Sequence, residues 1–249
     1  MSAEATGAEL QTIVAARLLR DAGSVFIGVG RPGTAAILAR EIYNPDLVLV
    51  YESGTIGAKP SRVPLSIGDG ELAETADTVV SVAEMFNYWI GAGRVQVAFL
   101  GAAQIDRHAN LNSTVIGDYA HPKTRLPGAG GAPEIAAGCE EVVVIAPHDP
   151  RTLVERLDFR TTVGFGDGPG DRERFGYRGR GPSAVVTDLG LLEPDPESKE
   201  LVLTRVHPGV SVEQARRATG WDLRVAAEPE ATEPPDAEEL SALRELQAR

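Results

Sequence analysis

The sequence of 249 residues has one cysteine, Cys139, few aromatic residues and fewer basic than acidic side chains. A single cysteine excludes an internal disulfide framework and any zinc site built from several thiolates. With 24 Lys and Arg against 36 Asp and Glu, the net charge is −12. That charge argues against general binding to nucleic acid or to an anionic membrane. No run of about 18 apolar residues is present, so we expect no membrane-spanning segment.

What is present is the composition of a globular chain, with 43% hydrophobic and 24% charged residues. Such a chain is long enough to bury a sizeable core. The first ten residues carry Glu4 and Glu9 and no basic segment. They do not predict a secretory signal, so we expect a cytoplasmic protein. The four histidines show no metal-ligand spacing, so we expect turn or surface positions for them and no metal site: His108, His121, His148 and His207.

Apolar runs alternate with helical patterns along most of the chain. The runs predict strands over 24–30, 47–51, 95–103 and 141–147, and the helical patterns cover 6–21, 34–41, 82–92 and 133–138. Thr6 and Glu9 have the spacing of a capping box. This alternation predicts an α/β fold, an open and mostly parallel sheet with crossover helices. Two further strands, able to pair, are expected over 184–192 and 200–206, with a short helix over 212–218.

Composition divides the chain into a body, residues 1–225, and a tail, residues 226–249. The tail has a Glu/Pro-rich stretch over 227–236, which reads as a linker. A last helix over 237–247 carries three leucines on one face and is expected to dock on the body or on a partner. Within the body, residues 54–78 look irregular, and the Gly/Arg-rich residues 164–182 predict a long loop.

The first of three glycine-rich junctions is Gly28-Val29-Gly30-Arg31-Pro32-Gly33, which fits G-x-G-x-x-G between a strand and a helix. With Glu52 ending the next strand, it resembles a dinucleotide fingerprint and keeps an NAD-dependent oxidoreductase open as an alternative. Two observations count against this hypothesis. A helix precedes the first strand, and Pro32 removes a backbone donor from the turn. Glycines needed only for close backbone approach explain the motif equally well.

The second junction, Tyr51-Glu52-Ser53-Gly54, places a carboxylate where an apolar strand meets a glycine turn. Ligands bind outside the carboxyl ends of parallel strands, so Glu52 is a candidate ribose acceptor, metal ligand, base or nucleophile. The alternative is a solvated loop glutamate.

The third junction runs from Gln104 at a strand end to the glycines of residues 128–131 before a helix. Backbone N–H groups of such glycines can point at an oxyanion or a phosphate. From the pattern alone, Gln104 is equally plausible as an amide donor into a site and as a buried turn-former.

Together these residues resemble the beta chain of the class I coenzyme A transferases, of the glutaconate type. The matching stretches lie within residues 8–225 and are YESGTIGAKP (51–60), PLSIGDGELAETADTVV (64–80), FLGAAQIDRHANLNSTVIGDY (99–119), RLPGAGGAPEIA (125–136) and HPGV (207–210). The combination of the glutamate-glycine turn, GAAQ-D and GxGGA is far more specific than any one piece. Ala109 departs from the pattern, because relatives often carry glycine there.

The resemblance implies an open α/β sheet, a heteromer with a second (alpha) subunit, and Glu52 as a catalytic nucleophile. It implies that CoA enters as a thioester substrate and that no cofactor is tightly bound. It further implies succinyl-CoA as donor and a short dicarboxylate as acceptor, 3-oxoadipate first and glutaconate as the alternative, in bacterial aromatic-compound catabolism. Gly130 and Gly131, with Gln104, are then the expected oxyanion or CoA-binding donors.

Four cations next to the matching motifs are candidate contacts for CoA phosphates or for a dicarboxylate: Lys59, Arg62, Lys123 and Arg125. The alternative for each is a solvated surface position. A nearby acidic set is read as a solvated helix start rather than a metal site: Asp69, Glu71, Glu74 and Asp77. A non-catalytic ligand-binding module on a similar sheet remains a third hypothesis beside the transferase and the oxidoreductase.

Overall fold

The computed structural model describes residues 5–249 and begins with a capped helix, α1 (Gly7–Arg17). The Thr6 hydroxyl accepts from the Glu9 N–H, and the Glu9 carboxylate accepts from the Thr6 N–H, as the capping box predicts. A strand and a second helix follow, β1 (Ser24–Ile27) and α2 (Arg31–Ile42), and then β2 (Val48–Tyr51). The predicted order of helix, strand, helix and strand is therefore confirmed.

Five parallel strands form the centre of one large sheet, in the order β11-β10-β5-β1-β2. The three not yet introduced are β5 (Val97–Leu100), β10 (Glu141–Ile145) and β11 (Gly181–Val186). Strand β2 then lies to one side of β1 and β5 to the other. The carboxyl ends of these parallel strands are the edge where an α/β sheet usually binds its ligands. The predicted open, mostly parallel sheet is confirmed.

Further strands extend this sheet at both ends, all through antiparallel pairs except the last pair, β13–β14, which is parallel, and within residues 5–249 the sheet reaches ten strands. Next to β2 lie β3 (Thr55–Ile56) and the edge strand β4 (Thr78–Val79). Beyond β11 lie β12 (Gly190–Pro194), β13 (Leu201–Val206) and β14 (Arg224–Ala231).

Two predictions about the second half of the chain are wrong. The stretch 184–192 is two strands, because a turn at Thr187, whose hydroxyl accepts from the Gly190 N–H, reverses the chain between β11 and β12. Residues 227–231 are strand rather than linker, because β14 pairs with β13, and this strand also crosses the expected boundary at residue 225.

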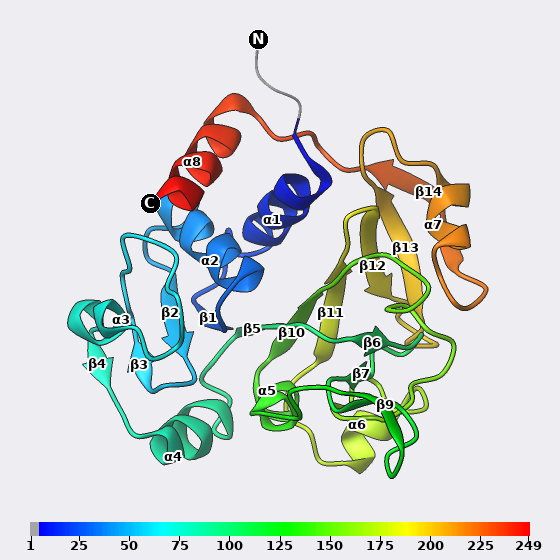
Figure 1. Ribbon diagram of the computed structural model, residues 1–249, viewed down its shortest axis with the longest axis horizontal. Coiled ribbons are helices and arrows are strands. Elements are labelled where there is room, and N and C mark those ends of the chain that lie inside the picture. The colour runs from blue at the N-terminus through cyan, green and yellow to red at the C-terminus, as the bar shows by residue number, and fades with distance from the viewer. Residues whose placement is uncertain (1–4) are drawn as a thin grey trace.

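Helices cover both faces of the sheet (Figure 1). On one face α1 and α2 pack with the last helix, α8 (Ala237–Ala248), which docks on the body through Leu240, Leu243 and Leu246. The other face is covered by further helices and by the loops between strands. These helices are η1 (Met85–Ile90), α5 (Ala132–Gly138) and α7 (Val212–Arg217), and the short α4 (Val82–Glu84) leads into η1 without burying a residue of its own. Among the described residues, no helix is both long and apolar enough to span a bilayer.

Short elements fill the segments expected to be irregular. Helix α3 (Gly70–Thr75) lies in the stretch 54–78, and α6 (Asp171–Arg174) lies in the Gly/Arg-rich loop. Two small hairpins follow β5: β6 (Gln104–Ile105) with β7 (Leu111–Asn112), and β8 (Val115–Gly117) with β9 (Pro122–Arg125).

Candidate active site

Glu52 lies at the tip of the tight hairpin between β2 and β3. In β2, Leu49 and Tyr51 face the core under α1, α2 and α8, while Val50 faces the core under η1 and α5. Because side chains alternate along a strand, the carboxylate that follows Tyr51 points to the side of Val50. Glu52 is partly exposed there. The sequence therefore places this carboxylate at the carboxyl end of a buried strand, as expected.

Gly54 closes the hairpin in a conformation that only glycine adopts easily. Its φ is +102°, and its N–H donates to the Tyr51 carbonyl at 3.0 Å. A Cβ at this position would lie 3.0 Å from the Val80 carbonyl carbon and would overlap the carbonyl oxygen. Strand β4 thus packs directly on the turn, which holds Glu52 against a rigid backbone rather than on a flexible loop.

Gly131 and Phe86 surround the carboxylate from the opposite side. Gly131 is the residue before α5, and a Cβ built on it would lie 2.7 Å from Phe86 Cε1 and 3.0 Å from Glu52 Oε1. The three residues therefore meet, although they come from β2, η1 and the glycine stretch. Sequence reasoning predicted Glu52 and Gly131 but missed Phe86, which reads as an ordinary apolar position in a helix.

The glycine stretch before α5 has backbone donors without acceptors. Gly130 has a φ of +51°, and a Cβ there would meet nothing within 4 Å. Among residues 5–249, neither the Gly130 nor the Gly131 N–H donates to another protein group. Unpaired N–H groups beside a carboxylate that faces solvent are suited to an incoming oxyanion.

A π-helical turn presents Phe86 to this site. The Gly91 N–H donates to the Phe86 carbonyl at 2.8 Å, and the Arg94 N–H donates to the Trp89 carbonyl at 2.8 Å, both five residues back. Turns of this kind are rare and occur often at functional sites. Gly91 and Gly93 follow, as the sequence predicted for the end of this helix.

Gln104 is engaged in hydrogen bonds within the chain. Its Nε2 donates to Asp158 Oδ2 at 2.9 Å, and its Oε1 accepts from Asn112 Nδ2 at 2.7 Å and from the Asp158 N–H at 3.0 Å. The side chain is 6% exposed. These contacts favour the turn-forming interpretation of Gln104 over that of a donor into the site.

Three of the four predicted cations have partners within the chain. Lys59 pairs with Asp77, and Arg62 pairs with Asp69 at 3.1 Å and with Glu71 at 3.4 Å. The acidic set read as a helix start thus supplies these partners, and Asp69 also caps α3 through the Glu71 N–H.

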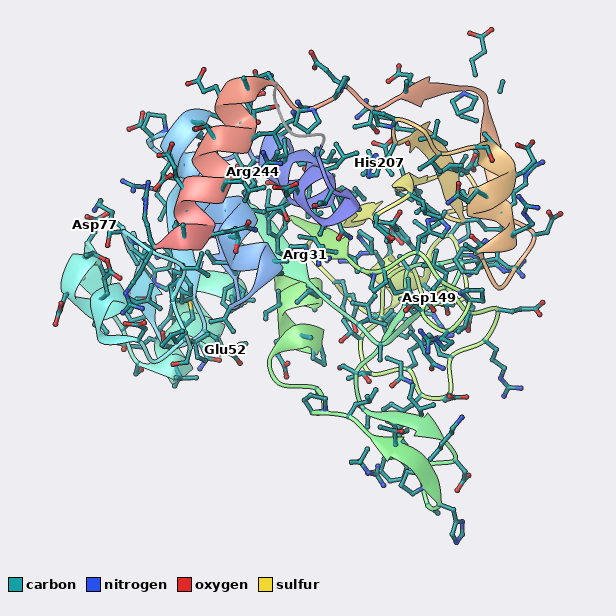
Figure 2. All side chains as sticks on the ribbon, turned by 45° about the horizontal axis from the view of Figure 1, so that its top comes forward. Arg31, Glu52, Asp77, Asp149, His207 and Arg244 are labelled. Atoms are coloured by element: carbon teal, nitrogen blue, oxygen red, sulfur yellow. The ribbon has the colours of Figure 1, made fainter. Side chains whose placement is uncertain are left out.

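Lys123 and Arg125 lie on β9, in the β8–β9 hairpin that projects from the body (Figure 2, green). Arg125 donates to the Tyr119 carbonyl at 3.0 Å and covers the Tyr119 ring.

The residues on either side of Glu52 carry buried hydroxyl groups. Within the described chain, Tyr51 Oη and Ser53 Oγ are buried without hydrogen-bond partners. Burial, reinforced by the negative charge of Glu71, raises the pKa of Tyr51 above its ordinary value. Tyr51 therefore stays neutral, and its side chain packs in the core under α1, α2 and α8.

Asn110 holds the predicted polar turn against the Gly/Arg-rich loop. Its Nδ2 donates to Asp106 Oδ2 at 2.8 Å and to the Gly166 carbonyl at 2.7 Å, and its Oδ1 accepts from the N–H groups of Gly164 and Gly166. Ala109 beside it has a φ of +54°, the conformation that favours glycine. Burial raises the pKa of Asp106, while the bonds from Asn110 oppose that shift.

Histidine positions were predicted only in part. His148 and His207 are buried rather than at the surface, although His207 does begin a turn, in which its carbonyl accepts from the Val210 N–H. Both form hydrogen bonds to Thr187, His148 to its hydroxyl and His207 to its carbonyl. Burial lowers the pKa of His148 to about 4. Across residues 5–249, no three His, Cys, Asp or Glu side chains group closely enough to hold a metal ion.

The first glycine motif serves the contact between helix and strand. A Cβ on Gly33 would lie 2.8 Å from the Gly28 carbonyl oxygen, so α2 packs closely on the end of β1. The Thr34 N–H and hydroxyl both donate to the Gly30 carbonyl. Arg31 at the same turn donates to Gln11 of α1 (Figure 2). The motif is explained by this packing and does not require a dinucleotide.

Comparisons with known proteins identify the family of this chain. The coenzyme A transferase family profile matches residues 9–217. The beta chain of 3-oxoadipate CoA-transferase from Pseudomonas knackmussii is 54% identical over 249 residues, 100% of this chain and 95% of the relative. The beta chain of glutaconate CoA-transferase from Acidaminococcus fermentans is 38% identical, over 92% of this chain and 88% of the relative. The crystal structure of glutaconate CoA-transferase from the same organism superposes with a TM-score of 0.91 at 36% identity, covering 97% of this chain and 94% of that one. This chain therefore belongs to the coenzyme A transferase family.

Proposed function

We propose that this chain is the subunit of a CoA-transferase that carries the nucleophile, Glu52, and that it moves CoA from succinyl-CoA to 3-oxoadipate. The observation that carries the proposal is the Glu52 carboxylate, held by the Gly54 turn and facing Gly131. The choice of acceptor is supported by the relative that is 54% identical over the whole chain. Glutaconate or another short dicarboxylate is the second candidate, supported by the 38% identical relative.

The reaction divides into two matched halves. The Glu52 carboxylate attacks the thioester carbonyl of succinyl-CoA, which gives a mixed anhydride and releases CoA thiolate. The thiolate then attacks the glutamyl carbonyl and releases succinate, leaving a glutamyl-CoA thioester. The carboxylate of 3-oxoadipate attacks this thioester, and the released thiolate attacks the acyl carbonyl of the new anhydride. The products are 3-oxoadipyl-CoA and the original carboxylate, so the enzyme acts as a covalent carrier.

Each step passes through a tetrahedral oxyanion that needs donors. The free N–H groups of Gly130 and Gly131 are the groups we assign to this role, because Gly131 lies against Glu52, Gly130 precedes it, and neither N–H has an acceptor within residues 5–249. One such donor is worth about 3 kcal/mol of transition-state stabilisation. Gln104 is left out of the assignment because its hydrogen bonds are made inside the chain.

Among the four cations, Lys123 is the best remaining candidate for an anionic substrate. Lys59, Arg62 and Arg125 have acidic or carbonyl partners, whereas Lys123 forms no ion pair or side-chain hydrogen bond with the rest of residues 5–249. Its hairpin leads directly into the glycine stretch, where the Gly128 N–H donates to the Ser113 carbonyl at 2.9 Å.

We infer that the chain assembles with a second CoA-transferase subunit, since each of the two relatives above is one subunit of such an enzyme. Large apolar side chains are exposed before α3 and on β4, α4 and η1. Leu65 is 87% exposed, and Tyr88 on η1 is 63% exposed. Val79 on the edge strand β4 and Val82 on α4 add to this surface, and Figure 1 shows β4, α3 and α4 together at one end of the sheet. Such a surface suits a protein partner.

The test is to trap the covalent intermediate. The chain, purified with its partner subunit, is incubated with succinyl-CoA and treated with borohydride, and peptides are mapped by mass spectrometry. We expect reduction of Glu52 to the alcohol. Glu52→Gln should lower the transfer rate by at least about three orders of magnitude, as loss of a nucleophile does. Glu213→Gln, on the exposed face of α7, is the matched control and should keep full activity.

An active complex that forms no adduct at Glu52 contradicts the covalent scheme. The acceptor is tested separately, by transfer rates for 3-oxoadipate, glutaconate and other short dicarboxylates. A faster rate with glutaconate than with 3-oxoadipate would replace the first substrate by the second and leave the nucleophile in place.

A further inference from the structure

A basic cleft lies in the Gly/Arg-rich loop, and none of the residues that line it is used in the reaction steps above. Its volume is about 430 Å³, and its walls carry four cations and one acid, Glu173. The cations are Arg172, Arg178, Arg180 and Lys199, and the aromatic walls are Phe165 and Tyr177. On a chain with a net charge of −12, such a concentration of positive charge is an exception.

One of the four cations builds the cleft rather than serving a ligand. Arg172 on α6 is 5% exposed. Its guanidinium donates to the carbonyls of Gly164 and Ala136 at 2.9 Å each and to that of Gly179 at 2.9 and 3.1 Å. Because Ala136 belongs to α5, these bonds fix α6 beside α5 (Figure 1). The cleft is thus framed by an arginine whose guanidinium is held by backbone carbonyls.

Of the other three cations, one has acidic partners and two have none within residues 5–249. Arg180 pairs with Glu141 and with Glu140 at 3.4 Å. Within residues 5–249, Arg178 and Lys199 form no ion pair and no side-chain hydrogen bond. Lys199 also has a φ of +61°, rare for a lysine, in the turn between β12 and β13. That turn places its ammonium 5.8 Å from the Phe165 ring centroid.

We propose that this cleft binds an organic phosphate of nucleotide size. Two cations without counter-ions supply charge for phosphate oxygens, and the volume falls in the range of small-molecule sites, far above what a single oxyanion fills. The phosphate belongs either to the nucleotide end of a CoA thioester or to a free adenine nucleotide. The inference does not use Glu52 and stands whether or not the transfer reaction is the one proposed.

The binding test uses the full chain with its partner subunit and isothermal titration calorimetry. The probes are adenosine 3′,5′-bisphosphate, ADP and uncharged adenosine. We expect the phosphates to bind, adenosine not to bind, and affinity to fall as salt rises. Arg178→Gln and Lys199→Gln should each weaken binding at least about tenfold. Arg174→Gln is the matched control, since this exposed arginine of the same loop pairs with Asp171 outside the cleft and should bind as the wild type does.

Competition then identifies the source of the phosphate. Displacement of the bisphosphate by succinyl-CoA assigns the cleft to the CoA thioester, whereas ADP binding that succinyl-CoA does not displace assigns it to a free nucleotide. Equal affinity in the wild type and in the folded Arg178→Gln/Lys199→Gln variant overturns the proposal, as does the absence of phosphate binding in the wild type. If the double variant unfolds, Arg178→Lys and Lys199→Arg decide, because both keep the charge and should keep binding.

Discussion

Gly131→Ala tests the geometry at Glu52 with a single added methyl group. The new Cβ would lie 2.7 Å from Phe86 Cε1 and 3.0 Å from Glu52 Oε1, whereas ordinary contacts begin at 3.4 Å. The added Cβ would also overlap Phe86 Cζ, so the ring must move by about 1 Å, and the carboxylate must move by about 0.4 Å. Overpacking of this kind costs about 1–3 kcal/mol of stability.

The larger effect should fall on turnover. A misplacement of about 1 Å at reacting atoms lowers rates about a hundredfold, so the smaller shift of the carboxylate should lower kcat by about three- to tenfold. The assay is the initial rate of CoA transfer at saturating succinyl-CoA, together with the rate at which Glu52 becomes trapped. Gly23→Ala is the control, because its Cβ would meet only Gln96 Oε1 at 3.6 Å, at the amino edge of the sheet.

A compensating change separates misplacement from general damage. Phe86→Leu removes the ring atoms that the new methyl group would meet, so Gly131→Ala/Phe86→Leu should recover part of the lost rate. Full activity of Gly131→Ala at unchanged melting temperature would refute the inferred meeting of Gly131, Phe86 and Glu52.

Three further changes probe the framework around the site. Stability should fall from pH 6.5 towards pH 4, because the unfolded chain protonates His148 while the native pKa of about 4 keeps it neutral. The free energy of unfolding should fall by at most about 3 kcal/mol. Urea denaturation at several pH values should show that this free energy depends less on pH in His148→Gln than in the wild type. An unchanged pH dependence would contradict its assignment to His148. Gly54→Ala should lower the free energy of unfolding by more than about 4 kcal/mol or prevent folding, because its Cβ would overlap the Val80 carbonyl. A near-normal expression level and melting temperature would show that β4 can move to make room for the methyl group. Asn110→Ala should lose about 3 kcal/mol, since the N–H groups of Gly164 and Gly166 lose their acceptor, and trypsin should cut residues 164–182 faster; unchanged proteolysis would mean that other contacts hold this loop.

The centre of the sheet could be predicted from sequence because its signals are local. Strands β1, β2, β5 and β10 are short apolar runs separated by helical patterns, and these patterns depend only on nearby residues. The edges could not be predicted in the same way. Strand β14 is Glu- and Pro-rich and forms because β13 offers an unpaired edge, a property of a segment far away in sequence.

The residues of the candidate site also differ in whether their position depends on local or on distant sequence. Glu52 could be placed because a carboxylate after a buried strand and before a glycine is visible in a window of a few residues. Phe86 could not, because nothing in its own segment says that a glycine 45 residues later will lie against its ring. The pairing of Lys59 with Asp77 was equally invisible, since the hairpin of β3 and β4 brings the two together.

Helix α8 has a consequence for how the chain matures. It seals the surface of α1 and α2, where Glu239 bonds with Arg17 and Tyr43 and Arg244 pairs with Glu9. A nascent chain leaves the ribosome in sequence order. The apolar surface of α1 and α2 therefore stays exposed to water until residues 237–248 have been synthesised. Chaperones can bind this surface throughout synthesis, and we expect them to bind stalled translation products there.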